Sequence, residues 1–181
     1  SKACAGVAVS DSPVGPFVYQ GSFRPNNAMS RDQTVFVDDD GRAYQFYSSE
    51  NNETMYISLL TDDYLKPSGR FTRNFVKESR EAPAVFKYNG KYYFSYSTGD
   101  THRLCYAVGD NPYGPFTYRG VILTPVVGWT THHAIIEYQN KWYLFHHDCV
   151  PSGGKTWLRS LKVTELEYDM DGNIITIDGG A

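Results

Sequence analysis

Short apolar and aromatic runs recur along the chain at a fixed spacing. The runs "VFVDDDGRAYQFYSS", "VFKYNGKYYFSYST" and "IIEYQNKWYLFHHD" begin at Val35, Val85 and Ile135, which are 50 residues apart each time. Each run has the pattern of a short apolar strand, a tight polar turn and an aromatic-rich strand. The Asp-Gly and Asn-Gly pairs in the first two turns favour hairpins. The pattern therefore predicts three successive β-hairpins.

A second repeat runs in step with the first. The segments "AVSDSPVGPFVYQG" (8–21) and "AVGDNPYGPFTYRG" (107–120) lie 99 residues apart and share nine of their fourteen positions. Both have a strand end, a turn rich in Pro and Gly, and then alternating Phe and Tyr. No capping residue is followed by a sustained helical periodicity. A period near 50 residues with about four strands per unit is typical of a β-propeller.

These repeats predict an all-β, propeller type of fold in a single partial domain that spans residues 1–181. The blades are expected at about 31–80, 81–130 and 131–181, with residues 1–30 as part of an earlier blade, so that about three and a half blades are present. Known propellers close with about four or more blades. We therefore expect further N-terminal sequence, a second chain or an oligomer to complete the ring. The alternative is a plain sandwich of hairpins, which gives no reason for a fixed period.

Polar residues stand just ahead of the first strand of each hairpin. Asp32, Glu81 and His132 precede Val35, Val85 and Ile135 by three or four residues. In a propeller the innermost strands line one channel, so we expect these side chains to converge at its mouth. Two carboxylates that share a site perturb each other's titration, and one that stays protonated can act as a general acid in glycoside hydrolysis. The alternative is exposed acids at strand starts and a structural histidine.

Two further residues are candidates for contact with a substrate. Trp129 lies just before His132 and is expected either to form a stacking wall for a sugar ring or to pack in the core. His102, in the segment "DTHRL", is expected in a loop near the cleft. His146 and His147 are consecutive at a strand end and face opposite sides, so they are not expected to bind one metal ion together.

The composition excludes several classes of function. The 181 residues are 41% hydrophobic and 20% charged, with a net charge of −3. This weak negative charge argues against binding to nucleic acid or to an anionic membrane, because both need clustered Lys and Arg. No apolar run approaches the ~18 residues of a membrane span. No signal peptide is visible; we expect a secreted or periplasmic protein, with a cytoplasmic one as the alternative.

The three cysteines do not form a recognisable framework. Cys4, Cys105 and Cys149 are odd in number, widely spaced and without a CxxC pair. A disulfide framework or a zinc site is therefore not expected. We interpret all three as buried thiols.

Several motifs together resemble one family of enzymes. The segments "DSPVGPF", "RDQTVFVDDDG", "EAPAVFKYNGKYYFSYS", "DNPYGPFTYRG" and "THHAIIEYQNKWYLFHHD" are similar, in order and spacing, to glycoside hydrolase family 43. The resemblance runs over nearly the whole chain. It implies a five-bladed propeller that hydrolyses glycosides with inversion, using an Asp base, a Glu acid and an Asp that tunes the pKa of the acid and orients it.

The same resemblance implies roles for individual residues. Asp32 matches the tuning Asp, and Glu81 matches the general acid. His132 matches a histidine beneath the site, where members of the family often hold a calcium ion through its water shell. Arg159, in "TWLRSLKV", resembles an arginine of the last blade that contacts sugar. No residue matches the base, and no cofactor is required for the chemistry.

The expected function is the release of terminal xylose or arabinose from plant polysaccharides or oligosaccharides. Residues 1 to about 87 are most similar to exo-β-1,3-galactanase-like members, whereas the rest resembles xylosidases and arabinofuranosidases. A galactanase-like glycosidase is therefore one alternative. A carbohydrate-binding propeller without activity is another, because such a protein tolerates the loss of the base.

Overall fold

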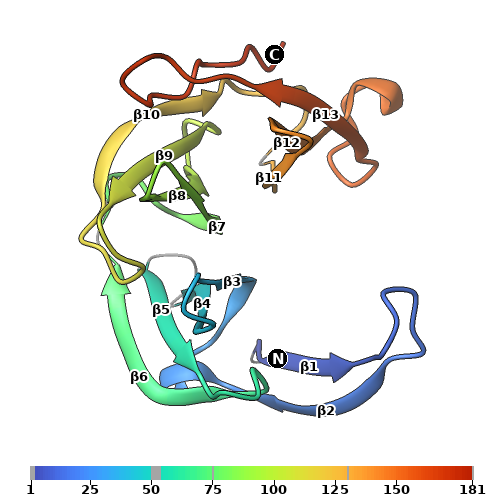
Figure 1. The fold of residues 1–181 in the computed structure, drawn as a ribbon. Coiled ribbons are helices and arrows are strands. Elements are labelled where there is room, and N and C mark those ends of the chain that lie inside the picture. The colour runs from blue at the N-terminus through green and yellow to red at the C-terminus, as the bar shows by residue number, and fades with distance from the viewer. Residues whose placement is uncertain (1–2, 50–53, 75, 130, 181) are drawn as a thin grey trace.

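A computed structural model describes residues 3–49, 54–74, 76–129 and 131–180, and over these ranges the chain is almost entirely β-structure (Figure 1). Its only helical pieces there are two three-residue 3-10 turns, η1 (Pro25–Asn27) and η3 (Val150–Ser152). The strands are β1 (Ala5–Val9), β2 (Val18–Phe23), β3 (Arg31–Val37), β4 (Ala43–Ser49), β5 (Thr54–Leu60), β6 (Pro67–Asn74), β7 (Glu81–Tyr88), β8 (Lys91–Ser97), β9 (Leu104–Gly109), β10 (Thr117–Leu123), β11 (Ala134–Tyr138), β12 (Lys141–Asp148) and β13 (Ser160–Leu166).

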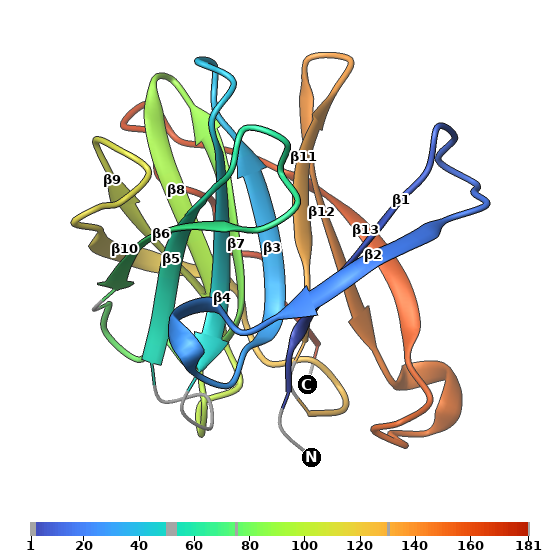
Figure 2. The ribbon, with the colours of Figure 1, turned by 90° about the horizontal axis from the view of Figure 1, so that it is seen from below.

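The strands form four antiparallel sheets, ordered β1-β2, β3-β4-β5-β6, β7-β8-β9-β10 and β11-β12-β13. The sheets stand face to face around an open arc, and β3, β7 and β11 lie on its inner side (Figure 1). Figure 2 shows the inner strands β3, β4 and β7 running roughly parallel to the axis of this arc, whereas the outer strands β6 and β10 run across it in Figure 1. The predicted all-β, propeller-type fold is confirmed, and each sheet falls within one of the expected blade ranges.

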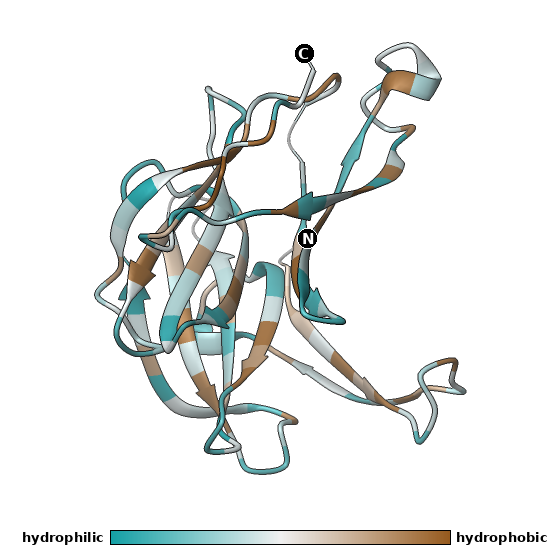
Figure 3. Ribbon diagram, turned by 45° about the horizontal axis from the view of Figure 1, so that its top comes forward, coloured by the Kyte–Doolittle hydropathy of each residue, from teal (hydrophilic) through white to brown (hydrophobic). Residues whose placement is uncertain are grey.

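The core lies between the blades rather than within them. One hydrophobic cluster joins the β3–β6 sheet to the β7–β10 sheet, with Phe46 and Phe94 at a ring separation of 6.1 Å. A second cluster joins the β7–β10 sheet to the last one, with Phe86 and Trp142 at 5.2 Å. Alternating hydrophobic and hydrophilic bands along the strands (Figure 3) reflect this arrangement. The central blade is therefore buried on both faces, as the continuous burial of β8 after Lys91 also shows.

The two sheet faces that border the opening of the arc remain apolar and accessible. The strand register shows that six large apolar side chains lie on these faces, turned away from the two hydrophobic clusters. They are Val35 and Val37 on β3, Ile136 and Tyr138 on β11, and Leu161 and Val163 on β13, and all are at least 44% exposed. Such faces are covered by a neighbouring blade wherever the arc has one.

The three cysteines form no disulfide with one another. Cys105 and Cys149 are buried, but Cys4 is exposed, so the expectation that all three are buried was wrong for Cys4. Cys4 lies ahead of β1, at the end of the arc where no sheet covers it. In the described part of the chain, no helix is long and apolar enough to cross a membrane.

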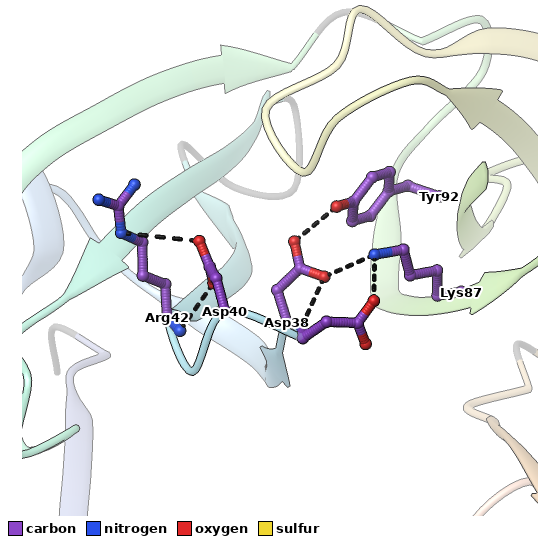
Figure 4. Close-up of polar contacts among 6 residues, drawn as sticks. Asp38, Asp40, Arg42, Lys87 and Tyr92 are labelled. Atoms are coloured by element: carbon purple, nitrogen blue, oxygen red, sulfur yellow. Dashed lines mark hydrogen bonds and ion pairs between the residues drawn. The ribbon is translucent and has the colours of Figure 1, made fainter. Parts of the chain in front are cut away.

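A charged cluster links the β3–β4 turn to the neighbouring blade (Figure 4). Asp38 accepts hydrogen bonds from the Tyr92 hydroxyl at 2.5 Å and from the Lys87 ammonium at 3.0 Å. Lys87 also contacts Asp39 at 2.6 Å. Burial alone would raise the pKa of Asp38, but the hydrogen bonds from Tyr92 and Lys87 outweigh it and lower the pKa below its ordinary value of 3.8. The run of three acids thus forms a hairpin turn, as the sequence predicted, and also fastens two blades together.

We predict that Asp38→Asn lowers the free energy of unfolding by about 1–3 kcal/mol at pH 7, because Lys87 and Tyr92 lose the more enclosed of the two carboxylates in this cluster. Since the native pKa is lowered, the contribution of Asp38 is complete above pH 3.8 and declines as the pH falls below it. Urea unfolding at pH 7 and pH 3 measures this. Asp110→Asn, which removes an exposed partner of Lys91, serves as the control and should change stability much less. Equal effects of the two substitutions would contradict the assignment.

Candidate active site

Backbone irregularities mark the start of two innermost strands. In β3 the register passes from Arg31↔Ser48 to Thr34↔Phe46, and β3 therefore has one extra residue at this point. In β7 the register passes in the same way from Glu81↔Ser97 to Ala84↔Ser95. Both are β-bulges, which re-aim side chains and are frequent beside functional sites.

Each bulge contains a residue with left-handed backbone geometry. The φ angle is 48° at Asp32 and 53° at Ala82, a region that side chains other than Gly seldom adopt. Strain of this kind persists where the surrounding structure imposes it. The two bulges are 50 residues apart, so the repeat places the same distortion in both blades.

Asp32, Glu81 and His132 come together where the inner strands begin. One carboxylate oxygen of each acid and one ring nitrogen of His132 all lie within 4.8 Å of one another, and all three residues are partly buried. The Oδ2 atom of Asp32 accepts a hydrogen bond from the backbone N–H of Ala82 at 3.3 Å, which ties it to the residue after Glu81. The adjoining pocket is lined by Asp32, Gln33, Thr34, Ala82, Pro83, His132 and His133.

The two acids do not occupy strictly equivalent positions in their blades. Glu81 pairs with Ser97 as Arg31 pairs with Ser48, so the equivalent of Asp32 is Ala82. The prediction that both acids occupy one equivalent position of the repeat is therefore wrong by one residue. The bulges explain why both carboxylates nevertheless converge, because successive residues of an undistorted strand would face opposite sides.

His132 is supported by the neighbouring strand β12. The backbone N–H of His132 donates to Nε2 of His147 at 3.0 Å, and the two rings are roughly parallel at 6.4 Å. Accepting this bond requires Nε2 of His147 to be unprotonated. Burial, together with the positive charge of Arg159 and the neighbouring His132, lowers the pKa of His147 to about 4. The support for His132 therefore remains intact at neutral pH.

His133 points toward the adjacent blade. Its Nε2 atom lies 2.7 Å from the Ser95 hydroxyl, and its Nδ1 atom is enclosed without a hydrogen-bond partner among the described residues. Burial, with smaller effects from His132 and His146, lowers the pKa of His133 to about 3. The ring is therefore neutral in the folded protein at physiological pH.

The other predicted residues lie outside the group of Asp32, Glu81 and His132. Trp129 is 61% exposed, which excludes the alternative of a packed core tryptophan. The rings of His102 and Trp129 contact each other edge to face at a centroid distance of 6.3 Å, so these two residues form one surface. Arg159 is exposed, donates from Nε to the backbone oxygen of Thr156, and acts electrostatically on His147. None of the three lines the pocket that contains Asp32 and His132.

Two residues with a clear structural role at the site were not identified from the sequence. Ser97 is the last residue of β8 and His147 the last but one of β12, and each contacts the segment that carries His132. Ser48 occupies the same place in the β3–β6 sheet. Aligning the ends of the second strands, rather than only the starts of the first, would have drawn attention to this position.

The spacing of the two acids limits what they can do together. Inverting glycosidases hold acid and base ~6.5–9.5 Å apart, whereas retaining enzymes hold acid and nucleophile ~5–5.5 Å apart. The oxygens of Asp32 and Glu81 are too close to act as an inverting acid–base pair. If one of them is the acid, the other either orients it or is a nucleophile. An arc of face-to-face blades with this acidic centre on its inner side defines a β-propeller protein with a carboxylate site on the axis.

Comparison with known proteins gives the family. The model described as Glycosyl hydrolases family 43 matches residues 1–174. A protein named xylosidase/arabinosidase from Bacteroides ovatus is 51% identical, and the match covers 96% of this chain and 65% of that protein. A protein named beta-xylosidase from Xylanibacter ruminicola is 50% identical, with 95% and 65% covered. The chain belongs to glycosyl hydrolase family 43, and it spans about 65% of the length of these curated relatives.

Solved structures agree with this placement. CoXyl43, a family 43 β-xylosidase/α-arabinofuranosidase from a compost metagenome solved with xylotriose, is 44% identical with a TM-score of 0.88, covering 97% of this chain and 66% of that one. A Xanthomonas citri GH43_1 enzyme in complex with xylotriose is 37% identical with a TM-score of 0.88, covering 97% and 64%. A family 43 β-1,3-galactosidase is 27% identical with a TM-score of 0.75, covering 89% and 36%.

We predict that folding stability depends on the neutral state of His133. The unfolded chain takes up a proton near pH 6.5, which native His133 does not accept until about pH 3, so stability falls as the pH drops from 6.5 toward 3. One such proton changes the free energy of unfolding by up to about 1.4 kcal/mol per pH unit. In His133→Asn, denaturant unfolding between pH 6.5 and 4.5 should show a shallower dependence. An unchanged slope in a folded variant would contradict this prediction.

Proposed function

We propose that this chain carries the general acid of an inverting glycosidase that releases terminal xylose or arabinose from xylan-derived oligosaccharides. The observation that carries the proposal is the convergence of Asp32, Glu81 and His132 on the axis of a family 43 propeller. The names of the relatives at about 50% identity, and the xylotriose complexes of two similar structures, favour a pentose over galactose.

In this mechanism Glu81 protonates the glycosidic oxygen as the bond to the sugar breaks. Asp32, fixed by the N–H of Ala82, orients the Glu81 carboxyl group. A general base deprotonates the water that attacks the opposite face of the sugar, which inverts the anomeric centre. Trp129 and His102 offer a stacking surface, and Arg159 offers hydrogen-bond donors to sugar hydroxyls.

The general base lies outside the group that Asp32, Glu81 and His132 form in the described part of the chain. We infer that it comes from β-structure that packs on the exposed apolar faces beside the opening of the arc, notably the face with Val35 and Val37. A second chain or an oligomer that completes the ring would supply both the cover and the base. That no base belongs to the group of Asp32, Glu81 and His132 also fits the alternative of a carbohydrate-binding propeller, which needs no base.

We predict that Glu81→Gln lowers kcat on xylobiose by about 10²–10⁴-fold, because its leaving group requires protonation. The loss should be much smaller on nitrophenyl β-xyloside, because nitrophenolate leaves without a proton. Initial rates on both substrates, with circular dichroism to establish folding, test this, and nitrophenyl arabinofuranoside and galactoside test the choice of sugar. Near-normal xylobiose hydrolysis by the variant would overturn the acid assignment. Xylotriose binding without turnover by any preparation, including one in which the ring has been completed, would support the binding module instead.

We further infer that a calcium ion binds beside His132 through water molecules. Calcium prefers oxygen ligands at 2.3–2.6 Å, so a direct bond to the imidazole is disfavoured and a bridging water suits it better. Direct coordination by Glu81 would keep that carboxylate ionised and unable to act as the acid. A calcium ion held through water by His132 would add positive charge near the site and would leave the Glu81 carboxyl free to act as the acid.

We predict that calcium raises the unfolding temperature of the protein, since a ligand at 100 times its Kd adds about 2.7 kcal/mol of stability. Differential scanning fluorimetry with calcium, magnesium or EDTA measures the shift. His132→Ala should abolish the effect of calcium but not the fold. A calcium response that is the same in His132→Ala and in the unaltered protein would exclude this location.

A further inference from the structure

Strand β8 belongs to the same sheet as Glu81, and two of its side chains contact the segment that carries His132. Residues of β8 alternate between its two faces, and Tyr92, Phe94 and Tyr96 pack toward the β3–β6 sheet. Tyr93 faces the last blade. Ser95 and Ser97 share the face of Tyr93, although both lie in an otherwise aromatic stretch.

Both serines are buried and both contact the segment 131–133. The hydroxyl of Ser97, a residue that is 1% exposed, donates to the backbone oxygen of Thr131 at 2.6 Å. The hydroxyl of Ser95 lies 2.7 Å from Nε2 of His133. These contacts bind the residues on either side of His132 to the blade that carries Glu81.

Ser97 is also connected to Glu81 through the backbone. It is the register partner of Glu81 in the β7–β8 ladder, and its carbonyl oxygen accepts the N–H of Arg80 at 3.2 Å. One residue therefore holds the strand of the acid by its main chain and the segment of His132 by its side chain.

Thr131 continues the connection into the last blade. Thr131 is 3% exposed, and its hydroxyl accepts the N–H of His147 at 3.2 Å while lying 3.1 Å from the His147 backbone oxygen. The ring of His147 in turn accepts the N–H of His132. An unbroken set of hydrogen bonds thus runs from Ser97 through Thr131 and His147 to His132.

We propose that Ser97 and Thr131 are positioning residues that set the distance between the Glu81 carboxyl and the His132 imidazole across the seam between two blades. Hydrophobic packing aligns the blades, but it is non-directional and leaves small sliding movements unopposed. A buried hydrogen bond with a fixed partner adds the missing directional constraint. The expected effect on catalysis rests on the proposed function, whereas the expected effect on the position of His132 is independent of it.

The test uses Ser97→Ala and Thr131→Val, each of which removes one of the two hydroxyl groups. Thr131→Ser, which keeps the hydroxyl group at position 131, is compared with them. Ser58→Ala is the matched control, because Ser58 is a buried serine of β5 that bonds to Tyr47 within its own sheet. Heteronuclear NMR of the histidine rings, with the His132 signal assigned from His132→Ala, reports the position of His132 directly. The protein has five histidines, so the spectrum is simple.

We expect the His132 ring signal to shift or broaden in Ser97→Ala and in Thr131→Val, and to stay in place in Thr131→Ser and in Ser58→Ala. If the chain is active, the first two variants should lose about 10–100-fold in kcat with little change in KM, because small displacements of catalytic groups have effects of this size. An unchanged His132 signal in folded Ser97→Ala and Thr131→Val would overturn the proposal. A shifted signal in a chain without activity would support the positioning role and count against the proposed function alone.

Discussion

The face-to-face packing of the central blade against both of its neighbours is the constraint on which the rest of the structure depends. Strand β8 carries this constraint because it has no exposed face after Lys91. Phe94 fills the seam with the β3–β6 sheet, and Tyr93 fills the seam with the last sheet. If either seam opened, Glu81 would separate from Asp32 or from His132, since Asp32 and Glu81 lie in different sheets and His132 stands just ahead of β11 in a third sheet.

The active-site chemistry follows from this geometry in a simple way. Each blade contributes one polar residue at the start of its inner strand, and packing of the blades brings the three within 4.8 Å. Two β-bulges correct the directions of the side chains, so that acids from unequal repeat positions meet. Backbone strain at Asp32 and Ala82 accompanies this correction. The surrounding histidines stay neutral because burial lowers their pKa values, which leaves the carboxylates as the acidic groups of the centre.

The sequence was sufficient to predict the blades and the convergence of Asp32, Glu81 and His132, because a fixed repeat places the start of each inner strand at the same level around an axis. It could not predict the bulges at Asp32 and Ala82, since an extra residue in one strand leaves no mark on the hydrophobic pattern. Ser97 was missed for a different reason. A small polar residue in an aromatic strand looks like an interruption of the core, and its purpose is visible only when the partner from another blade is known.

The most direct test of the account is the stereochemistry of hydrolysis. Proton NMR of the first product released from a β-linked xyloside distinguishes the two anomers before they interconvert. If Glu81 is the acid, Asp32 its orienting partner and the base lies farther away, the first product is the α-anomer. Initial release of the β-anomer would contradict the account, because Asp32 and Glu81 would then act as the closely spaced nucleophile and acid of a retaining enzyme.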